Sequence, residues 1–170
     1  MTGKDQAVVA ESAVQMSTDP KQTLADDSEE LSAVVLLKRE QAEEMFRHAR
    51  AALPQECCGL VAGKEGRATS VYPLRNVAVN PAVAYEAAPE DIFAAQRSMR
   101  AKGELLLGIY HSHPRSADPV PSETDVRLAY YPQAVYFIIG FSGEQTVLRA
   151  FRLFEAQGRW EAVPFAVLEG

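Results

Sequence analysis

The chain has 170 residues and a mass of 18.6 kDa, which suits one domain able to bury its own core. Apolar residues make up 47% of it, and no run approaches the roughly 18 apolar residues of a membrane-spanning helix. The net charge is −6 and no dense cluster of Lys or Arg occurs, so neither a nucleic acid nor a membrane is expected as a partner.

The N-terminal segment, residues 1–31, differs from the rest of the chain. It holds seven acidic residues, two lysines and no aromatic residue, whereas the remaining residues are nearly neutral. Such a segment buries too little apolar surface to offset its ordering entropy, which predicts a disordered acidic tail before a domain at 32–170. A docking segment is the alternative. No secretion signal is evident, and the adjacent Cys57 and Cys58 cannot staple a small domain, so a cytoplasmic protein is expected.

Two helices and three strands are predicted in the first part of the domain. A short apolar strand at 33–37 precedes a helix whose apolar residues recur at helical spacing and which Pro54 ends. Strands are expected at 58–63 and 69–74, followed by an irregular segment at 76–88. A second helix runs from Pro89 to Lys102, with Gly103 as its stop.

The second part of the chain is richer in strands. A short helix is expected at 122–131, before Pro132, and a proline-rich loop at 113–121 precedes it. The predicted strands are 105–110, 135–141, 146–154 and 160–165. This order of elements predicts an α/β fold of the α+β type, with a mixed, largely antiparallel sheet flanked by two or three helices.

Candidate metal ligands follow the strand at 105–110. His111 and His113 are two residues apart, so along a strand their side chains point the same way and can hold one zinc ion. Asp125, at a helix start, is the candidate third ligand. Three protein ligands leave an open position for a water molecule, whose pKa zinc lowers to about 7. Two alternatives stay open: a hydrogen-bonded histidine pair, and a helix capping box formed by Ser122 and Asp125.

The sequence His111-Ser112-His113-Pro114, seven further residues and Ser122-x-x-Asp125 resembles in full the JAMM signature, or MPN+ motif. This signature belongs to zinc metalloproteases of the Mov34/PAD-1 superfamily. Upstream, Glu56-Cys57-Cys58-Gly59 stands where that family has its E-x-x-G. The resemblance extends over roughly residues 31–165 and implies a cytidine-deaminase-like MPN domain.

The resemblance also implies a role for each matching residue. His111, His113 and Asp125 correspond to the ligands of one Zn²⁺ per chain. Glu56 corresponds to the general base, because a carboxylate near the metal, but not on it, can accept a proton from water. Ser122 corresponds to the residue that helps to stabilise the tetrahedral intermediate.

A zinc-dependent peptidase or isopeptidase is the implied function, acting on an amide bond at the C-terminal tail of a ubiquitin-like protein. The compact chain resembles the small stand-alone prokaryotic members, which implies a sulfur-carrier substrate of the ThiS or MoaD type with a Gly-Gly tail. We expect residues 76–88 to border the groove for this tail. The alternatives are a non-catalytic MPN-type interaction scaffold, which the complete set of motif residues disfavours, and a zinc hydrolase of a small amide. The sequence leaves a homodimer open.

Overall fold

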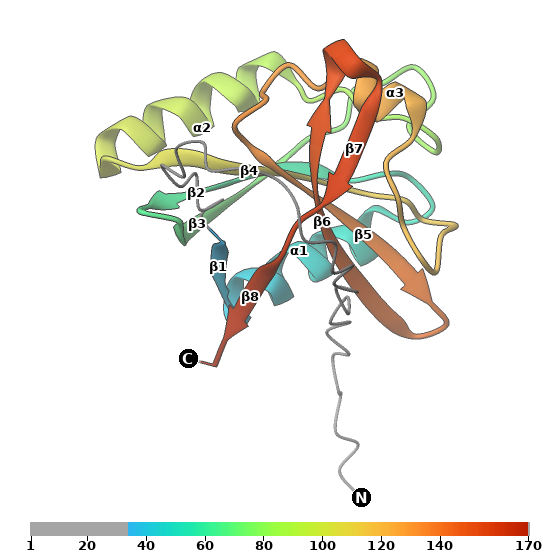
Figure 1. The fold of residues 1–170 in the computed structure, drawn as a ribbon, viewed down its shortest axis with the longest axis horizontal. Coiled ribbons are helices and arrows are strands. Elements are labelled where there is room, and N and C mark those ends of the chain that lie inside the picture. Colours follow the sequence, from blue (N-terminus) through green and yellow to red (C-terminus); the bar gives the residue numbers. More distant parts are fainter. Residues whose placement is uncertain (1–33, 170) are drawn as a thin grey trace, which may run out of the picture.

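A single eight-stranded sheet, in the order β7-β6-β5-β4-β2-β3-β1-β8, organises the computed structural model (Figure 1). The structure describes residues 34–169, and the acidic tail expected at 1–31 lies outside the described residues. The strands are β1 (Val35–Lys38), β2 (Cys58–Lys64), β3 (Arg67–Leu74), β4 (Leu105–Ser112), β5 (Val135–Ser142), β6 (Gln145–Phe154), β7 (Arg159–Ala162) and β8 (Phe165–Leu168). The helices are α1 (Arg39–Ala52), α2 (Pro89–Lys102), α3 (Glu123–Arg127) and a 3₁₀ turn at Glu155–Gln157.

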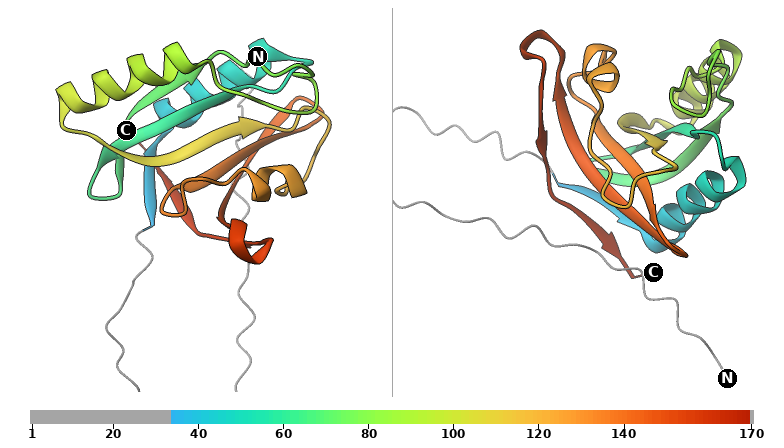
Figure 2. Two further views of the ribbon diagram at one scale, coloured as in Figure 1. Left: turned by 90° about the horizontal axis from the view of Figure 1, so that it is seen from above. Right: turned by 90° about the vertical axis from the view of Figure 1, so that its right-hand side faces the viewer.

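The sheet is mixed and strongly curled, as Figure 2 shows. Pairs β2–β3, β2–β4, β5–β6 and β6–β7 are antiparallel, whereas β1–β3, β1–β8 and β4–β5 are parallel. The prediction of a mixed sheet flanked by helices is therefore confirmed. Among residues 34–169, no helix is long and apolar enough to cross a membrane.

The two long helices begin and end where the sequence predicts. The apolar face of α1 buries Met45 and Ala49 in the main core, and the helix stops just before Pro54, which cannot continue it. Pro89 starts α2 because its missing N–H would have no helical partner there. Gly103 ends α2 in the left-handed conformation, with φ of 64°.

Two predicted elements differ from the structure. The helix expected at 122–131 ends at Arg127, and the chain then turns so that the Tyr131 N–H donates to the Tyr136 hydroxyl at 3.2 Å. The strand expected at 160–165 is two strands, β7 and β8, on either side of Pro164. Proline has no N–H for the strand ladder, so the chain leaves β6 there and joins β1 at the opposite edge of the curled sheet.

Side chains alternate along β4 and serve the two faces of the sheet differently. Tyr110 is fully buried on the α1 side, and its hydroxyl lies 2.8 Å from Nδ1 of His48. His111 is fully buried on the opposite side, where α3 packs. One strand thus contributes core packing to one face and a candidate ligand to the other.

Gly59, the glycine of the E-x-x-G segment, lies directly opposite Tyr110 in the β2–β4 ladder. A Cβ atom at this position would lie 2.3 Å from ring atoms Cε1 and Cζ of Tyr110. Only glycine lets the tyrosine ring lie flat against the backbone of β2. The packing of this ring against β2 therefore depends on the absence of a side chain at position 59.

We expect Gly59→Ala to destabilise the fold, because the added methyl group overlaps a ring that the core holds in place. Overpacking of this kind costs about 1–3 kcal/mol, which lowers the Tm of a domain of this size by roughly 3–10 °C. Thermal unfolding followed by circular dichroism measures the shift. A Tm equal to that of the wild type would show that Tyr110 moves aside freely.

Candidate metal centre

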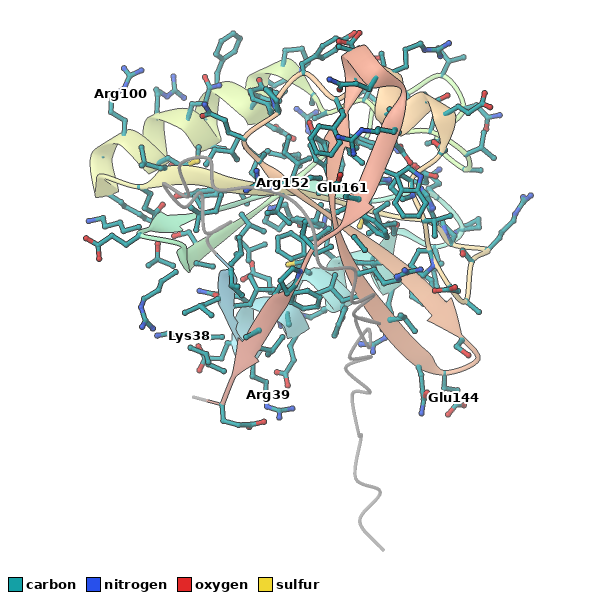
Figure 3. The ribbon with its side chains drawn as sticks, viewed as in Figure 1. Lys38, Arg39, Arg100, Glu144, Arg152 and Glu161 are labelled. Atoms are coloured by element: carbon teal, nitrogen blue, oxygen red, sulfur yellow. The ribbon has the colours of Figure 1, made fainter. Side chains whose placement is uncertain are left out.

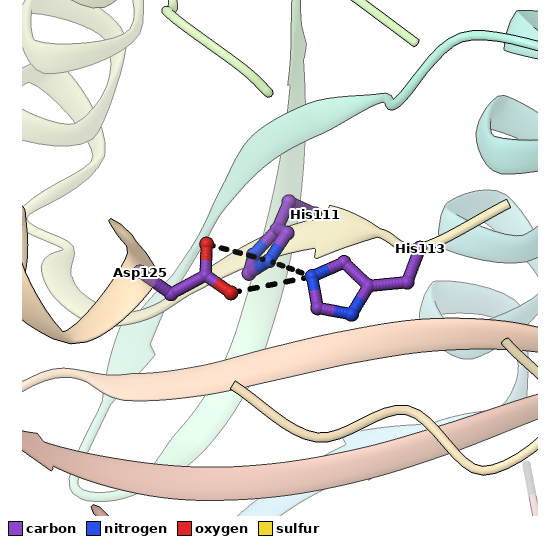
Figure 4. Close-up of side chains that lie close together, drawn as sticks. All are labelled: His111, His113 and Asp125. Atoms are coloured by element: carbon purple, nitrogen blue, oxygen red, sulfur yellow. Dashed lines mark hydrogen bonds and ion pairs between the residues drawn. The ribbon is translucent and has the colours of Figure 1, made fainter. Parts of the chain in front are cut away.

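Both candidate histidine ligands lie at the end of β4, which runs between β2 and β5. Their Nε2 atoms are 3.0 Å apart and face the same point (Figure 4). The backbone N–H of His113 donates to the Ile139 carbonyl on β5 at 2.8 Å, which holds this residue in line beyond the strand end. The alternation predicted from the sequence therefore brings the two imidazoles together.

Asp125 approaches the histidines from the first turn of α3. Its Oδ1 lies 3.3 Å from Nε2 of His111, and its Oδ2 lies 3.2 Å from Nε2 of His113. The capping box is present as well: the Ser122 N–H donates to Oδ2 at 2.7 Å, and the Asp125 N–H donates to Ser122 Oγ at 3.1 Å. The helix cap and the contact with the histidines thus coexist, and the cap fixes the carboxylate toward the cluster.

The spacing of these donor atoms fits a zinc ion. Ligand atoms in a tetrahedral zinc site with bonds of about 2.0–2.1 Å lie about 3.3 Å from one another. The two Nε2 atoms are 3.0 Å apart; Nε2 of His111 lies 3.3 Å from Oδ1 of Asp125 and Nε2 of His113 lies 3.2 Å from Oδ2, so each separation is close to this value. Two imidazole nitrogens and one carboxylate also form a donor set that leaves a fourth position open for water or substrate.

The protonation states of the cluster suit a cation as well. Burial lowers the pKa of His111, which favours the neutral imidazole that binds metals. Burial alone would raise the pKa of Asp125, but its interactions with His111 and His113 outweigh this effect and hold the pKa well below its usual range. The Asp125 carboxylate therefore carries a negative charge that a divalent cation would offset.

Glu56 lies two residues before the start of β2 and is 7% exposed. Burial raises its pKa to about 7, while His113 lowers the pKa and the charge of Asp125 raises it, so the carboxyl lies within electrostatic reach of the cluster. The next residue is tied to the ligand strand: the Cys57 N–H donates to Ser112 Oγ at 2.8 Å, and the Ser112 N–H donates to the Cys57 carbonyl at 3.2 Å. Ser112, between the two histidines, thus connects them to the glutamate.

The cysteines do not join this cluster. Both are free and buried, and burial raises the pKa of Cys57 to about 11 and that of Cys58 to about 12. Protonated, buried thiols are poor nucleophiles and poor ligands. Neither thiol is therefore expected to act as a nucleophile or a metal ligand.

Tyr85 contacts the cluster, which the sequence did not predict. Its ring stacks on that of His111, with centroids 4.6 Å apart and an angle of 28° between the planes. The other nitrogen of His111, Nδ1, is buried and has no hydrogen-bond partner within the described residues. The stacked ring of Tyr85 thus packs against an imidazole whose polar contacts are all made by Nε2. The only signal in the sequence was an aromatic residue inside the irregular segment 76–88.

A groove of about 480 Å³ opens beside Glu56 and is lined by residues that include His48, Cys57, Arg75, Asn76 and Val77. None of the three candidate ligands lines it. Residues 76 and 77 thus border a groove next to Glu56, and the role of the segment 76–88 beside a carrier tail stays a prediction.

Comparison with known proteins places the chain in a family. The family described as prokaryotic homologs of the JAB domain matches residues 38–154. Desampylase of Haloferax volcanii is 37% identical over 121 residues, which are 68% of this chain and 86% of that protein. The probable TtuB-protein conjugate cleaving protease of Thermus thermophilus is 36% identical over 73% and 79% of the two chains. The CysO-cysteine peptidase of Mycobacterium tuberculosis is 31% identical over 72% and 84%.

Solved structures agree with this placement. A protein of Desulfitobacterium hafniense is 34% identical and superposes with a TM-score of 0.70 over 79% of this chain and 93% of its own. A JAB1/MPN domain protein of Archaeoglobus fulgidus shares the fold, with a TM-score of 0.52 and 17% identity over 78% and 98% of the two chains. By sequence and by fold, the chain belongs to the prokaryotic JAB family of JAMM-type metallopeptidase homologues.

Proposed function

We propose that this protein is a zinc-dependent peptidase or isopeptidase that hydrolyses an amide bond at the C-terminal tail of a ubiquitin-like or sulfur-carrier protein. The observation that carries the proposal is the convergence of His111, His113 and Asp125 at zinc-ligand spacing, with the buried Glu56 in electrostatic reach. The family match at 38–154 lies within the proposed catalytic domain, residues 32–170.

One Zn²⁺ per chain would be held by His111, His113 and Asp125, and when bound it supplies a Lewis acid for an amide carbonyl and lowers the pKa of water to about 7. The carboxylate of Glu56 accepts the proton of the attacking water and returns it to the leaving amine. Burial raises the pKa of this carboxyl above its ordinary value, which makes it a stronger proton acceptor than an exposed glutamate.

Ser122 is the proposed hydrogen-bond donor to the oxyanion. Its Oγ accepts the N–H of Asp125 at 3.1 Å, so the hydroxyl proton stays available to donate. The cap of α3 fixes the position of this hydroxyl before substrate arrives. Donors that are fixed in advance stabilise charge that develops in a transition state most effectively.

The proposed substrate is a carrier protein of the ThiS or MoaD type with a Gly-Gly tail. This follows from the relatives, whose names describe a protease that cleaves TtuB-protein conjugates and a CysO-cysteine peptidase. The buried free thiols Cys57 and Cys58 suit the reducing cytoplasm, where we propose that the protein acts.

Metal content tests the ligand assignment. We expect about one zinc per chain in protein purified without chelators, and loss of this zinc in His113→Ala, because two remaining ligands hold the ion too weakly. Elemental mass spectrometry measures the ratio. His48→Ala is the matched control: His48 bonds Tyr110 on the other face of the sheet, so zinc is retained. A wild-type protein that stays free of zinc after incubation with zinc would overturn the proposal.

Hydrolysis of a carrier adduct tests the activity. The substrate is a sulfur-carrier protein whose Gly-Gly tail is joined by an amide bond to a short peptide, and mass spectrometry follows its cleavage. We expect Glu56→Gln to lower kcat about 10²- to 10⁴-fold with zinc retained, since the amide cannot accept the proton. Glu144→Gln makes the same change at the exposed β5–β6 turn (Figure 3) and should be fully active.

Three other outcomes of this assay would contradict the proposed base or favour an alternative function. Full turnover by Glu56→Gln would contradict the role of this base. Cleavage of a small Gly-Gly anilide but not of the protein adduct would favour the hydrolase of a small amide. Binding of the carrier without cleavage of either compound would favour the scaffold.

The raised pKa of Glu56 predicts a pH-dependent stability of the metal-free protein. The folded pKa, about 7, exceeds the ordinary value of 4.5, so the unfolded chain releases this proton first as the pH rises. Glu56 therefore lowers stability progressively between about pH 4.5 and 7, and by a constant amount above. The Tm of Glu56→Gln minus that of the wild type should rise across this window and then level off. A difference independent of pH would contradict the burial of this carboxyl.

A further inference from the structure

Residues 76–88 form a loop whose two ends are fastened together. The Val77 N–H donates to the Glu86 carbonyl at 2.7 Å, and the Ala88 N–H donates to the Arg75 carbonyl at 3.0 Å. Beyond these two hydrogen bonds, the Arg75 guanidinium binds Asp91 at the start of α2, with Nε 3.0 Å from Oδ2. The loop is therefore a closed unit between β3 and α2.

The side chain of Asn76 is the centre of this loop. Its Oδ1 accepts the N–H groups of Ala78 and Glu86, each at 3.0 Å. Its Nδ2 donates to the carbonyl of Ala84 at 2.9 Å and to that of Glu56 at 3.0 Å. These four bonds use both donors and both acceptor sites of the carboxamide, and they fix which atom is oxygen and which is nitrogen.

Three of these bonds shape the loop, and the fourth leaves it to reach the proposed base. The loop forms a second hydrogen bond with Glu56, because the Glu56 N–H donates to the Pro81 carbonyl at 2.7 Å. Both backbone groups of Glu56 thus bond to the loop, while Cys57, the next residue, bonds to Ser112 of the ligand strand. The backbone of Glu56 is held from two sides.

The same loop also touches the metal cluster. Tyr85, between Ala84 and Glu86, stacks on His111 at a centroid distance of 4.6 Å. Asn76 bonds both neighbours of this tyrosine, through the Ala84 carbonyl and the Glu86 N–H. One carboxamide therefore connects the backbone of Glu56 with the residue that packs against a candidate ligand.

We propose that Asn76 is a positioning residue, whose carboxamide holds the Glu56 backbone and shapes the loop so that the base keeps a fixed place relative to the metal cluster. The inference rests on the proposed function, because it concerns the same base. Asn76 itself touches neither the cluster nor the carboxyl of Glu56 among its hydrogen bonds. Its effect is exerted through Glu56.

Asn76→Asp is the sharpest variant, because it separates the two halves of the network. The carboxylate keeps an acceptor for the N–H groups of Ala78 and Glu86, so the loop retains its internal turn. It loses both donors and sets an anion against the carbonyls of Glu56 and Ala84. Gln157→Glu is the matched control, because it makes the same amide-to-carboxylate change at an exposed position of the 3₁₀ turn at Glu155–Gln157, outside the loop.

Kinetics on the carrier adduct give the first measurement. We expect Asn76→Asp to lower kcat about 10- to 100-fold with little change in KM, because a small misplacement of the base slows the reaction without removing substrate contacts. Zinc content should stay at the wild-type value, and Gln157→Glu should match the wild type in both constants. A wild-type kcat in Asn76→Asp would overturn the proposal, as would a loss of zinc that accounts for the lost activity.

Amide hydrogen exchange gives a second measurement that needs no activity. We expect the Glu56 N–H to exchange about tenfold faster or more in Asn76→Asp, while amides in the centre of β4 and β5 keep their protection. Uniformly faster exchange, or unchanged exchange at Glu56, would overturn the proposal, the former because it shows a general loss of stability. If the wild-type protein cleaves no substrate, but exchange at Glu56 is still locally faster in Asn76→Asp, the proposed function is contradicted. The hold of Asn76 on the Glu56 backbone is then established nevertheless.

Discussion

The register between β2 and β4 is the constraint on which the candidate site depends. Gly59 lies opposite Tyr110, and Cys58 lies opposite His111. The tyrosine ring fits only over a residue without a side chain, so this pair admits no neighbouring register. A slip by one residue would turn His111 into the α1 core and Tyr110 toward α3. The contact that builds the core on one face therefore also sets the ligand on the other.

The site concentrates charge in a place that disfavours it. Asp125 is held as an anion beside the buried His111, and the buried Glu56 adds a second carboxyl whose charged form is opposed by burial and by Asp125. A divalent cation would relieve both, since it offers opposite charge to a ligand and to a nearby base. Without metal, the same arrangement costs stability and raises the pKa of the Glu56 carboxyl.

Local chemistry made part of this structure predictable. The helix stops at Pro54 and Gly103, the cap at Ser122 and the spacing of His111 and His113 all act within a few residues, so they are visible in the sequence. Asn76 bonds Glu56, 20 positions away, and Tyr85 stacks on His111, 26 positions away. No periodicity or spacing in the sequence indicates such contacts. The division of the last predicted strand did have a local sign, Pro164, which bars a continuous ladder.

Only a few groups of the E-x-x-G segment take part in the contacts of the candidate site. Glu56 contributes its carboxyl, while Asn76 and Ser112 hold the chain through backbone groups of positions 56 and 57. Gly59 is required by the approach of Tyr110. The Cys57 thiol takes no part in these bonds, so its place in the segment is set by burial rather than by reactivity. Because these bonds reach backbone groups only, Asn76 and Ser112 leave the Glu56 carboxyl available for the proton transfer between water and leaving amine that we propose.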